Sequence, residues 1–407
     1  MTTLSPIRPA SDIGVHPRSG QDMTAGEPST QLNSGGHPSD TSGMRIPAAS
    51  PAEDGPPTGA TTGGRHRRGA PPRGIRQTDP THQPIPLDIL ASLEVLPCDV
   101  FLGYAGRYVL YAATGGDARD VVAHAGGNAE LAIRVEDRDV LRRGLSRSVG
   151  RILGDESRTP VERSRRAYAA VGYVMSPIFK ASGPLDRDDL EDATDAIDAL
   201  VARLSGMDSL VWSMVATMSK HLATHTHAIN TAVYAVLLGG AMREFQGDSI
   251  RDIGRGALLH DIGKNRIPLE ILDKPGPLDE EEWRRMREHP TVGHRMVVGA
   301  LGVEPSYAHI ISEHHERADG SGYPSGVRGR AIPPDSRLVA IADAYDALTS
   351  ARSYKPAGSS YNALWTMRFQ MRGQFDARIL EALAALLGGW KALRRADVRS
   401  LELAAAV

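Results

Sequence analysis

The sequence predicts a mainly α-helical protein, in which a helical bundle follows a small α+β domain and a disordered N-terminal tail. Three observations predict this fold class. Residues 1–84 are rich in proline and glycine and contain no aromatic residue. Residues 98–135 contain three short stretches rich in β-branched and aromatic residues, which is typical of strands. After Val135, apolar residues recur at spacings of three and four, the pattern of amphipathic helices.

The N-terminal tail has a composition that opposes folding. Residues 1–84 hold 13 of the 27 prolines and 12 of the 42 glycines, and apolar residues show neither helical nor alternating periodicity. Such a segment cannot bury enough apolar surface to offset the entropy of ordering its backbone, roughly 1 to 2 kcal/mol per residue. We therefore expect residues 1–84 to be disordered and ordered structure to begin near Ile85.

Residues 85–204 are expected to form a small α+β domain. The predicted strands are the stretches CDVFL, GRYVLYAA and ELAIRV, at residues 98–102, 106–113 and 130–135. The predicted helices follow them at residues 138–153, 161–180 and 189–204. Because no group of residues in this segment has catalytic spacing, we interpret it as a regulatory domain or as one that packs against the catalytic part.

The overall charge and cysteine content limit the partners and the compartment. The formal net charge is -2 and the pI is about 6.7, so no long-range field favours a nucleic acid polymer or an anionic membrane. A small phosphorylated ligand fits this balance better. The single cysteine, Cys98, cannot form an intrachain disulfide, and the sequence contains neither a long apolar run nor a basic-then-apolar leader. These features predict a cytoplasmic protein.

Five histidines and two aspartates in the C-terminal half carry the chemical signal. They lie in five separate places, three of which are apolar stretches: THTHAINTAVYAVLLGG, RGALLHDIGK and LVAIADAYDAL. A single histidine there is more often a satisfied core or surface residue, but a buried group of this size needs partners, because an unpaired polar group costs several kcal/mol. Imidazole suits iron, manganese, zinc and nickel, and a carboxylate can bridge two ions. The candidate metal ligands are His227, His260, Asp261, His289, His314, His315 and Asp343.

Adjacent histidines pose a geometric question. On a helix, His314 and His315 would point about 100° apart. Both can serve one site if the local backbone bends; otherwise one of them ligates and the other supports a ligand from behind. The remaining histidines, including His221, His225, His294 and His309, are interpreted as surface or structural residues.

Six segments together carry a resemblance to a known family. They are HDIGKNRIP, KPGPLDEEE, EHPTVGH, HHERADGSGYP, ADAYDALTSARSYK and FDARILEAL. In this order they resemble the HD-GYP family of bacterial phosphodiesterases. The resemblance implies an HD-type helical bundle over residues 205–390 that binds two or three metal ions, commonly iron or manganese. It also implies that this catalytic domain hydrolyses cyclic di-GMP to linear pGpG or on to GMP.

The resemblance implies a role for each candidate ligand. It assigns one metal to His227, His260, Asp261 and Asp343. It assigns the other metal to His289, His314 and His315, with Asp261 bridging the two ions as the catalytic carboxylate.

The resemblance also implies residues that contact the substrate. Lys264 follows His260 by four residues, hence on the same helical face, where its ammonium is expected to meet a phosphate oxygen during catalysis. Arg352 and Lys355 match positions that grip the phosphate and guanine of the ligand, as suits an arginine fork. Tyr323, in a tight glycine-rich loop, is expected to bracket the cleft, either contacting the nucleotide or packing under the loop.

One departure from the family pattern bears on the number of metal ions. Members of the family with three metals carry a glutamate four residues before the first ligand histidine, and that position here is Ala223. Because alanine cannot ligate, we expect two divalent ions, iron or manganese.

Two alternatives to a cyclic di-GMP phosphodiesterase stay open. One is an HD-domain hydrolase acting on another cyclic dinucleotide or on nucleoside phosphates, the latter disfavoured by the GYP loop and the RSYK segment. The other is a metal-bound signalling module with low turnover, and the complete ligand set argues against it. A regulatory protein partner and a homodimer are compatible with each interpretation.

Overall fold

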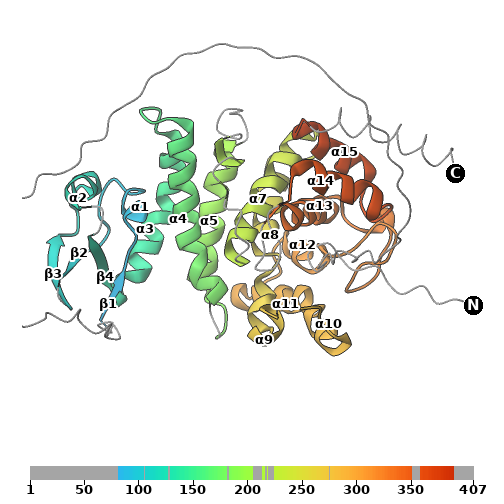
Figure 1. Cartoon of the computed structure of the whole chain (residues 1–407), viewed down its shortest axis with the longest axis horizontal. Coiled ribbons are helices and arrows are strands. Elements are labelled where there is room, and N and C mark those ends of the chain that lie inside the picture. Colours follow the sequence, from blue (N-terminus) through green and yellow to red (C-terminus); the bar gives the residue numbers. More distant parts are fainter. Residues whose placement is uncertain are drawn as a thin grey trace, which may run out of the picture. The chain divides into compact units, whose positions relative to one another are not determined.

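The computed structural model describes residues 81–388, apart from residues 105, 127–128, 181–182, 205–212, 216–217, 219–223, 275 and 351–357. The described part is mainly helical and contains one small sheet (Figure 1). The predicted mainly α fold with an α+β segment before the bundle is therefore confirmed. The disorder predicted for residues 1–84 is wrong at residues 82–84, which form a strand because they pair with residues 132–134. Residues 1–80 lie outside the described residues.

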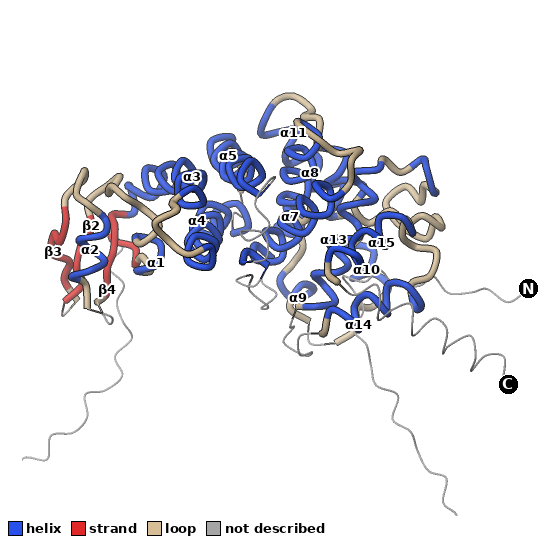
Figure 2. Tube along the Cα trace, turned by 90° about the horizontal axis from the view of Figure 1, so that it is seen from above, coloured by secondary structure: helices blue, strands red, loops and turns tan. Residues whose placement is uncertain are grey.

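The sheet has four antiparallel strands in the order β1-β4-β2-β3. The strands are β1 (His82–Pro84), β2 (Val100–Tyr104), β3 (Arg107–Ala112) and β4 (Glu130–Arg134). The three predicted strands are confirmed, and β1 adds a fourth just before Ile85. Two short helices, α1 (Leu87–Leu90) and α2 (Ala118–His124), lie beside the strands in Figure 2.

Three long helices follow the sheet, as their apolar periodicity predicts. They are α3 (Arg138–Gly154), α4 (Pro160–Lys180) and α5 (Arg187–Leu204), and the short η2 (Val135–Asp137) leads into α3. A capping box begins α4: the Thr159 hydroxyl accepts from the backbone N–H of Glu162, and the Glu162 carboxylate accepts from the backbone N–H of Thr159. Helix α4 buries one stripe, which includes Ala167, Val171 and Met175.

The bundle contains both long and short helices. These are α7 (Thr224–Ala241), α8 (Asp248–Leu259), η3 (Ile262–Arg266), α9 (Leu269–Leu272), α10 (Glu280–Met286), α11 (His289–Leu301), α12 (Ala308–Glu313), η4 (Gly329–Ala331), α13 (Pro334–Thr349), α14 (Ser360–Trp365), η5 (Thr366–Gln370) and α15 (Ala377–Leu386). Almost every described side chain of α7 and α13 is buried, whichever face of the helix it occupies. A helix buried all round lies at the centre of its domain, so these two helices form the middle of the bundle.

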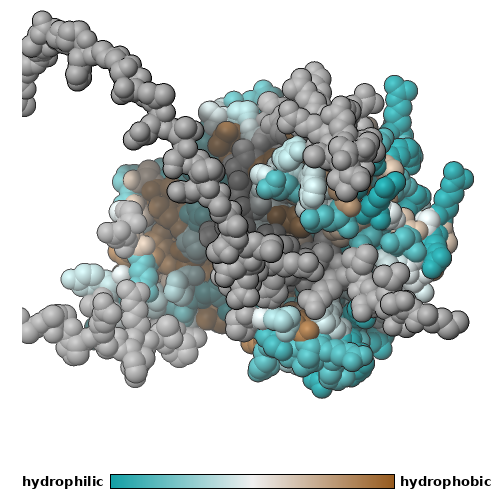
Figure 3. All heavy atoms as spheres, turned by 45° about the vertical axis from the view of Figure 1, so that its right-hand side comes forward, coloured by the Kyte–Doolittle hydropathy of each residue, from teal (hydrophilic) through white to brown (hydrophobic). Residues whose placement is uncertain are grey.

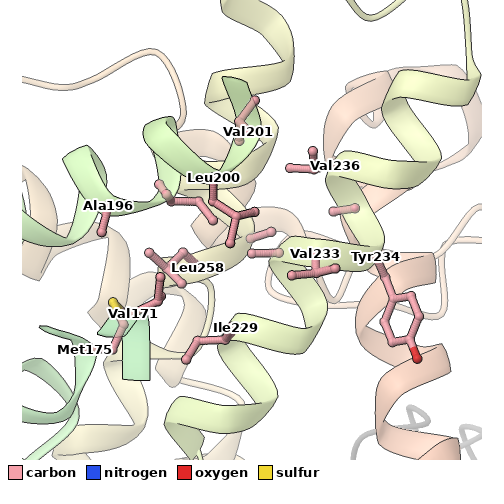
Figure 4. Packing of buried hydrophobic residues seen from close by; sticks show 14 of the residues in the cluster. Val171, Met175, Ala196, Leu200, Val201, Ile229, Val233, Tyr234, Val236 and Leu258 are labelled. Carbon is pink, nitrogen blue, oxygen red and sulfur yellow. The ribbon is translucent and has the colours of Figure 1, made fainter. Parts of the chain in front are cut away.

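One hydrophobic core runs from the upstream helices into the bundle. Figure 4 shows Val171 of α4, Leu200 of α5, Val233 of α7 and Leu258 of α8 packed together, and all four belong to the same buried cluster. An ion pair adds to this packing, because the Arg255 guanidinium of α8 donates to the Asp198 carboxylate of α5. The two segments therefore share an interface, and the domain boundary proposed after residue 204 stays a prediction.

One face of the molecule carries both polar and apolar surface. On the face drawn in Figure 3, hydrophilic side chains cover the right-hand and lower parts, and hydrophobic residues show toward the left. Among the described residues, no helix combines the length and apolar character needed to cross a membrane.

Candidate metal centre

Five elements bring the seven predicted ligands into one buried cluster. Helix α7 supplies His227, the end of α8 supplies His260 and Asp261, and α13 supplies Asp343. The other three are His289 at the first position of α11 and His314 and His315 in the turn after α12. All seven residues are buried, with at most 4% of each exposed.

The cluster divides into two groups of ligand-type atoms. In each group, one donor atom per residue lies within 4.8 Å of the others. One group consists of His227, His260 and Asp343, and the other of Asp261, His289, His314 and His315. The histidines and Asp343 divide as the resemblance implied, whereas Asp261, expected to hold the first metal and bridge to the second, groups with the second set. The assignment of metals to these residues stays a prediction.

Asp261 lies between the two groups and presents one carboxylate oxygen to each. Its Oδ2 is 3.3 Å from Nε2 of His260 and 3.7 Å from Nε2 of His227. Its Oδ1 is 3.2 Å from Nε2 of His289 and 3.9 Å from Nε2 of His314. This is the arrangement that a carboxylate bridging two cations requires.

The backbone fixes the tautomers of three cluster histidines. Nδ1 of His260, His289 and His314 lies 2.7, 2.7 and 2.9 Å from the carbonyl oxygen three residues earlier. A carbonyl only accepts, so each Nδ1 carries a proton, and each ring in its neutral form turns its Nε2 lone pair toward the cluster. Because Nε2 of His289 and of His314 are only 3.3 Å apart, their lone pairs repel unless a cation lies near both.

Several buried polar atoms of the cluster have no hydrogen-bond partner in the described part of the chain. They are Nε2 of His260, Oδ1 of Asp261, both ring nitrogens of His315 and Oδ2 of Asp343. Leaving such groups unpaired is costly, and metal coordination would satisfy all of them. The donor set therefore fits divalent metal ions.

The Asp346 carboxylate bonds to the nitrogen of His227 that faces away from the other histidines of the cluster. Nδ1 of His227 lies 2.7 Å from Oδ2 of Asp346, and its Nε2 faces Oδ1 of Asp343 at 3.1 Å. Burial lowers the pKa of His227, but the hydrogen bonds to Asp343 and Asp346 outweigh it and raise the pKa to about 9. Asp346 also accepts from Asn230 and Ser350, so its oxygens orient His227 and are not turned toward the cluster.

The pKa values of three other candidate ligands favour the protonation states that metals bind. Burial raises the pKa of Asp261, but the nearby His260 and Lys264 outweigh it and hold the pKa well below its usual range. Burial and the neighbouring histidines hold the pKa values of His314 and His315 well below theirs. Asp261 is therefore a carboxylate, and these two imidazoles are neutral.

Lys264 reaches the cluster by a different route from the predicted one. The helix does not continue past the HD dipeptide, because α8 ends at Leu259 and Lys264 lies in the separate η3. The assumed shared face with His260 is therefore wrong. The Lys264 ammonium instead donates to Oδ2 of Asp261 at 2.7 Å.

The backbone bends at the adjacent histidines, so both rings belong to the same group of ligand-type residues. This is the first of the two alternatives that the sequence left open. Helix α12 ends at Glu313, and both rings lie in the following turn with their centroids 4.2 Å apart. The loop after them is held by Glu316, whose carboxylate accepts from the backbone N–H groups of Ser325 and Gly326 at 2.7 and 3.2 Å.

Tyr323 packs against the cluster. It is 8% exposed, and its ring lies 4.6 Å from that of His315, with the Arg287 guanidinium 5.9 Å away on the ring face. These contacts match the alternative in which Tyr323 packs under its loop, and its predicted contact with substrate stays a prediction.

Several predicted positions lie elsewhere. Arg352, Lys355, Ala223 and His221 fall outside the described residues. His294 and His309 bond to carboxylates away from the cluster, at 3.1 Å from Glu304 and 2.9 Å from Asp335.

Sequence reasoning missed two residues that support His227. Neither Asp346 nor Asn230 was assigned this supporting role. Both follow a ligand by three residues, Asp346 after Asp343 and Asn230 after His227, so each lies near its helical neighbour. That spacing was the available signal.

Gly263 permits the close approach that places His289. A Cβ atom at Gly263 would overlap the carbonyl oxygen of His289 and lie 2.6 Å from the backbone nitrogen of Gly293. We expect Gly263→Ala to lower the free energy of unfolding by about 1 to 3 kcal/mol, as overpacking does. Gly240→Ala is the matched control, because no atom lies within 4 Å of its added Cβ. Urea unfolding measures both, and equal stability of the two variants would contradict this packing.

Comparisons with known proteins agree with this geometry. Residues 201–379 match the model of the HD domain family. Over 201 residues the chain is 33% identical to the cyclic di-GMP phosphodiesterase PA4108 of Pseudomonas aeruginosa, covering 49% of this chain and 48% of that protein. It is 37% identical over 164 residues to the 3'3'-cGAMP-specific phosphodiesterase 3 of Vibrio cholerae, covering 40% and 35%. The chain thus spans half or less of the length of these relatives.

A solved structure shares the fold. The HDG"Y"P protein Bd1817 of Bdellovibrio bacteriovorus superposes with a TM-score of 0.56 at 16% identity, covering 76% of this chain and 100% of that one. The HD-type bundle expected from the motifs is therefore confirmed. Residues 201–379 thus match the HD domain family, and the chain is similar in sequence to cyclic dinucleotide phosphodiesterases and in fold to an HDG"Y"P protein.

Proposed function

We propose that this protein is a metal-dependent phosphodiesterase that hydrolyses cyclic di-GMP to linear pGpG, to GMP or to both. The observation that carries the proposal is the position of Asp261, whose two oxygens face two separate groups of buried ligand-type atoms. The names of the relatives add support, since they describe hydrolysis of cyclic dinucleotides.

The proposed cofactor is a pair of divalent ions, iron or manganese. Nitrogen donors from histidine mixed with carboxylates suit these metals. His227, His260 and Asp343 would hold one ion, and the remaining group the other, with Asp261 shared. When bound, two such ions would activate water and stabilise the charge on the attacking and leaving oxygens of the phosphodiester.

The chain's own residues have two further tasks in this proposal. Lys264 lies with its ammonium at the edge of the cluster and is 16% exposed, so it can turn toward a phosphate oxygen that gains charge. Arg352 and Lys355 are proposed to bind the phosphate and guanine of the ligand, because an arginine fork matches the two acceptors on the Hoogsteen edge of guanine.

A second candidate substrate is 3'3'-cGAMP. The observation in its favour is the similarity to a phosphodiesterase specific for that nucleotide. The two substrates share the cyclic phosphodiester ring and differ in one base, so the metal cluster does not distinguish them. A metal-bound signalling module with low turnover is the alternative outside enzymes.

The test is turnover of the full chain loaded with Mn²⁺ under anaerobic conditions. We expect chromatography to show pGpG or GMP formed from cyclic di-GMP, with no product in excess chelator. Faster cleavage of 3'3'-cGAMP would make that nucleotide the substrate. Failure to cleave either nucleotide by metal-loaded protein would contradict the proposal and favour the signalling module.

A further inference from the structure

A chain of hydrogen bonds leads from the metal cluster to a helix outside the bundle. His227 bonds to Asp346 at 2.7 Å, Asp346 Oδ1 accepts from Nδ2 of Asn230 at 3.0 Å, and Asn230 Oδ1 accepts from the hydroxyl of Tyr168 at 2.9 Å. Tyr168 belongs to α4, which is part of the segment interpreted as regulatory. His227, Asp346 and Asn230 are each at most 4% exposed.

The carboxylate of Asp346 determines which groups donate and which accept in this series of hydrogen bonds. A carboxylate only accepts, so Asp346 must receive the amide N–H of Asn230 and the Nδ1–H of His227. The Asn230 amide then presents its oxygen on the opposite side, where the Tyr168 hydroxyl donates to it. Asp346 thereby fixes the orientation of the Asn230 amide, and Tyr168 stabilises that orientation by donating to the amide oxygen. Asp346 in turn holds Nε2 of His227 toward the cluster.

Helix α4 also contacts the other side of the cluster. The Ile178 carbonyl of α4 accepts from Nδ2 of Asn265 at 2.5 Å, and Asn265 lies in η3 directly after Lys264. Ile178 is within the last turn of α4, where carbonyl groups lack partners inside the helix, so Asn265 satisfies one of them. One helix therefore reaches both His227, through Tyr168, and the segment that follows Asp261.

We propose that Tyr168 is a positioning residue, through which α4 sets the orientation of His227 and hence the metal affinity of the cluster. This inference rests on the proposed metal centre. A displacement of α4 would loosen Asn230 and Asp346 and release the constraint on His227. Packing favours such coupling, because Val171 and Met175 of α4 lie against Ile229 of α7 in the shared core (Figure 4).

The test compares two tyrosines of the same helix in the full chain. Tyr168→Phe removes the hydroxyl that reaches Asn230. Tyr173→Phe is the matched control, because its hydroxyl instead accepts from Gln83 of β1 at 3.3 Å. Mn²⁺ affinity is measured by the paramagnetic resonance signal of the free ion, and melting of the metal-depleted chains checks that both variants fold.

We expect Tyr168→Phe to weaken Mn²⁺ binding by about tenfold, the lower end of the effect of residues that support a metal ligand. Tyr173→Phe should bind Mn²⁺ like the wild type. In a chain that carries Asn230→Ala, adding Tyr168→Phe should cost nothing further, because the connection is already cut. A merely structural role for Tyr168 would give additive losses.

Each result either supports or overturns the inference. Equal Mn²⁺ affinity of Tyr168→Phe, Tyr173→Phe and the wild type overturns this inference and leaves the proposed function standing. A wild-type chain that binds no Mn²⁺ overturns the proposed function, and the inference with it. If Tyr168→Phe does not fold, Asn230→Ala alone tests the connection inside the bundle, and unchanged Mn²⁺ affinity of that variant overturns the inference.

Discussion

Asp261→Ala is expected to remove metal and turnover together. Its oxygens Oδ1 and Oδ2 face different groups of histidines at 3.2 and 3.3 Å. Asp343 approaches the second group only at 3.9 Å, from its Oδ2 to Nδ1 of His315. Without Asp261, each proposed ion loses a negatively charged ligand, and His289 and His314 face each other at 3.3 Å with nothing to offset their repulsion. Plasma emission and hydrolysis of cyclic di-GMP measure the two losses.

Asp335→Ala is the matched control for this variant. Asp335 is half-buried and also bonds to a histidine, His309, but that pair lies away from the cluster. We expect the control to keep full metal content and rate. Full metal content and an unchanged rate in Asp261→Ala would show that the cluster is not the catalytic centre.

Lys264→Ala should give the next largest loss, with the metal retained. Lys264 contacts Asp261 but offers no lone pair to a metal while it is protonated, so we expect its role to be stabilisation of phosphate charge. Removing one such donor typically lowers kcat by about 100-fold or more. The matched control is Lys274→Ala, whose ammonium pairs with Glu282 outside the cluster.

Two further basic residues, Arg352 and Lys355, are expected to affect substrate binding more than the rate. Arg352→Ala and Lys355→Ala should keep their metal, and loss of the Arg352 contact should weaken substrate binding by about 1.5 to 3 kcal/mol, mainly as a higher KM. If Lys264→Ala, Arg352→Ala and Lys355→Ala all kept wild-type kinetics with cyclic di-GMP, the substrate assignment would be wrong.

The repeating elements could be predicted because their patterns are local. Strands β2, β3 and β4 alternate or concentrate apolar residues, and α3, α4 and α5 repeat them at helical spacing, so each appeared close to its predicted bounds. The seven clustered ligand-type residues could also be predicted, since buried polar residues in apolar helices need a common partner.

Local backbone breaks could not be predicted from periodicity. The stretch from His260 to Lys264 reads as one helix, yet the close packing of Gly263 on the backbone of His289 accompanies a break after Leu259. Likewise, the turn that lets His314 and His315 share one group depends on where α12 ends. These features are decided by tertiary contacts, which a single sequence does not contain.

The long-range hydrogen bonds also could not be predicted from the sequence. Tyr168 and Asn230 are 62 residues apart, and Asn230 and Asp346 are 116 residues apart. Neither pair belongs to a spacing that any single helix or strand would impose. The support of His227 therefore emerges only when α4, α7 and α13 pack together.

The most direct test of the account is the number and position of metal ions in crystals of the full chain grown with Mn²⁺. Anomalous scattering should give two peaks, one on each side of Asp261, because Ala223 replaces the carboxylate that three-metal relatives are expected to use. Installing Ala223→Glu should then add a third peak near His227. Three fully occupied ions in the wild type, or no peak beside Asp261, would contradict the two-metal centre.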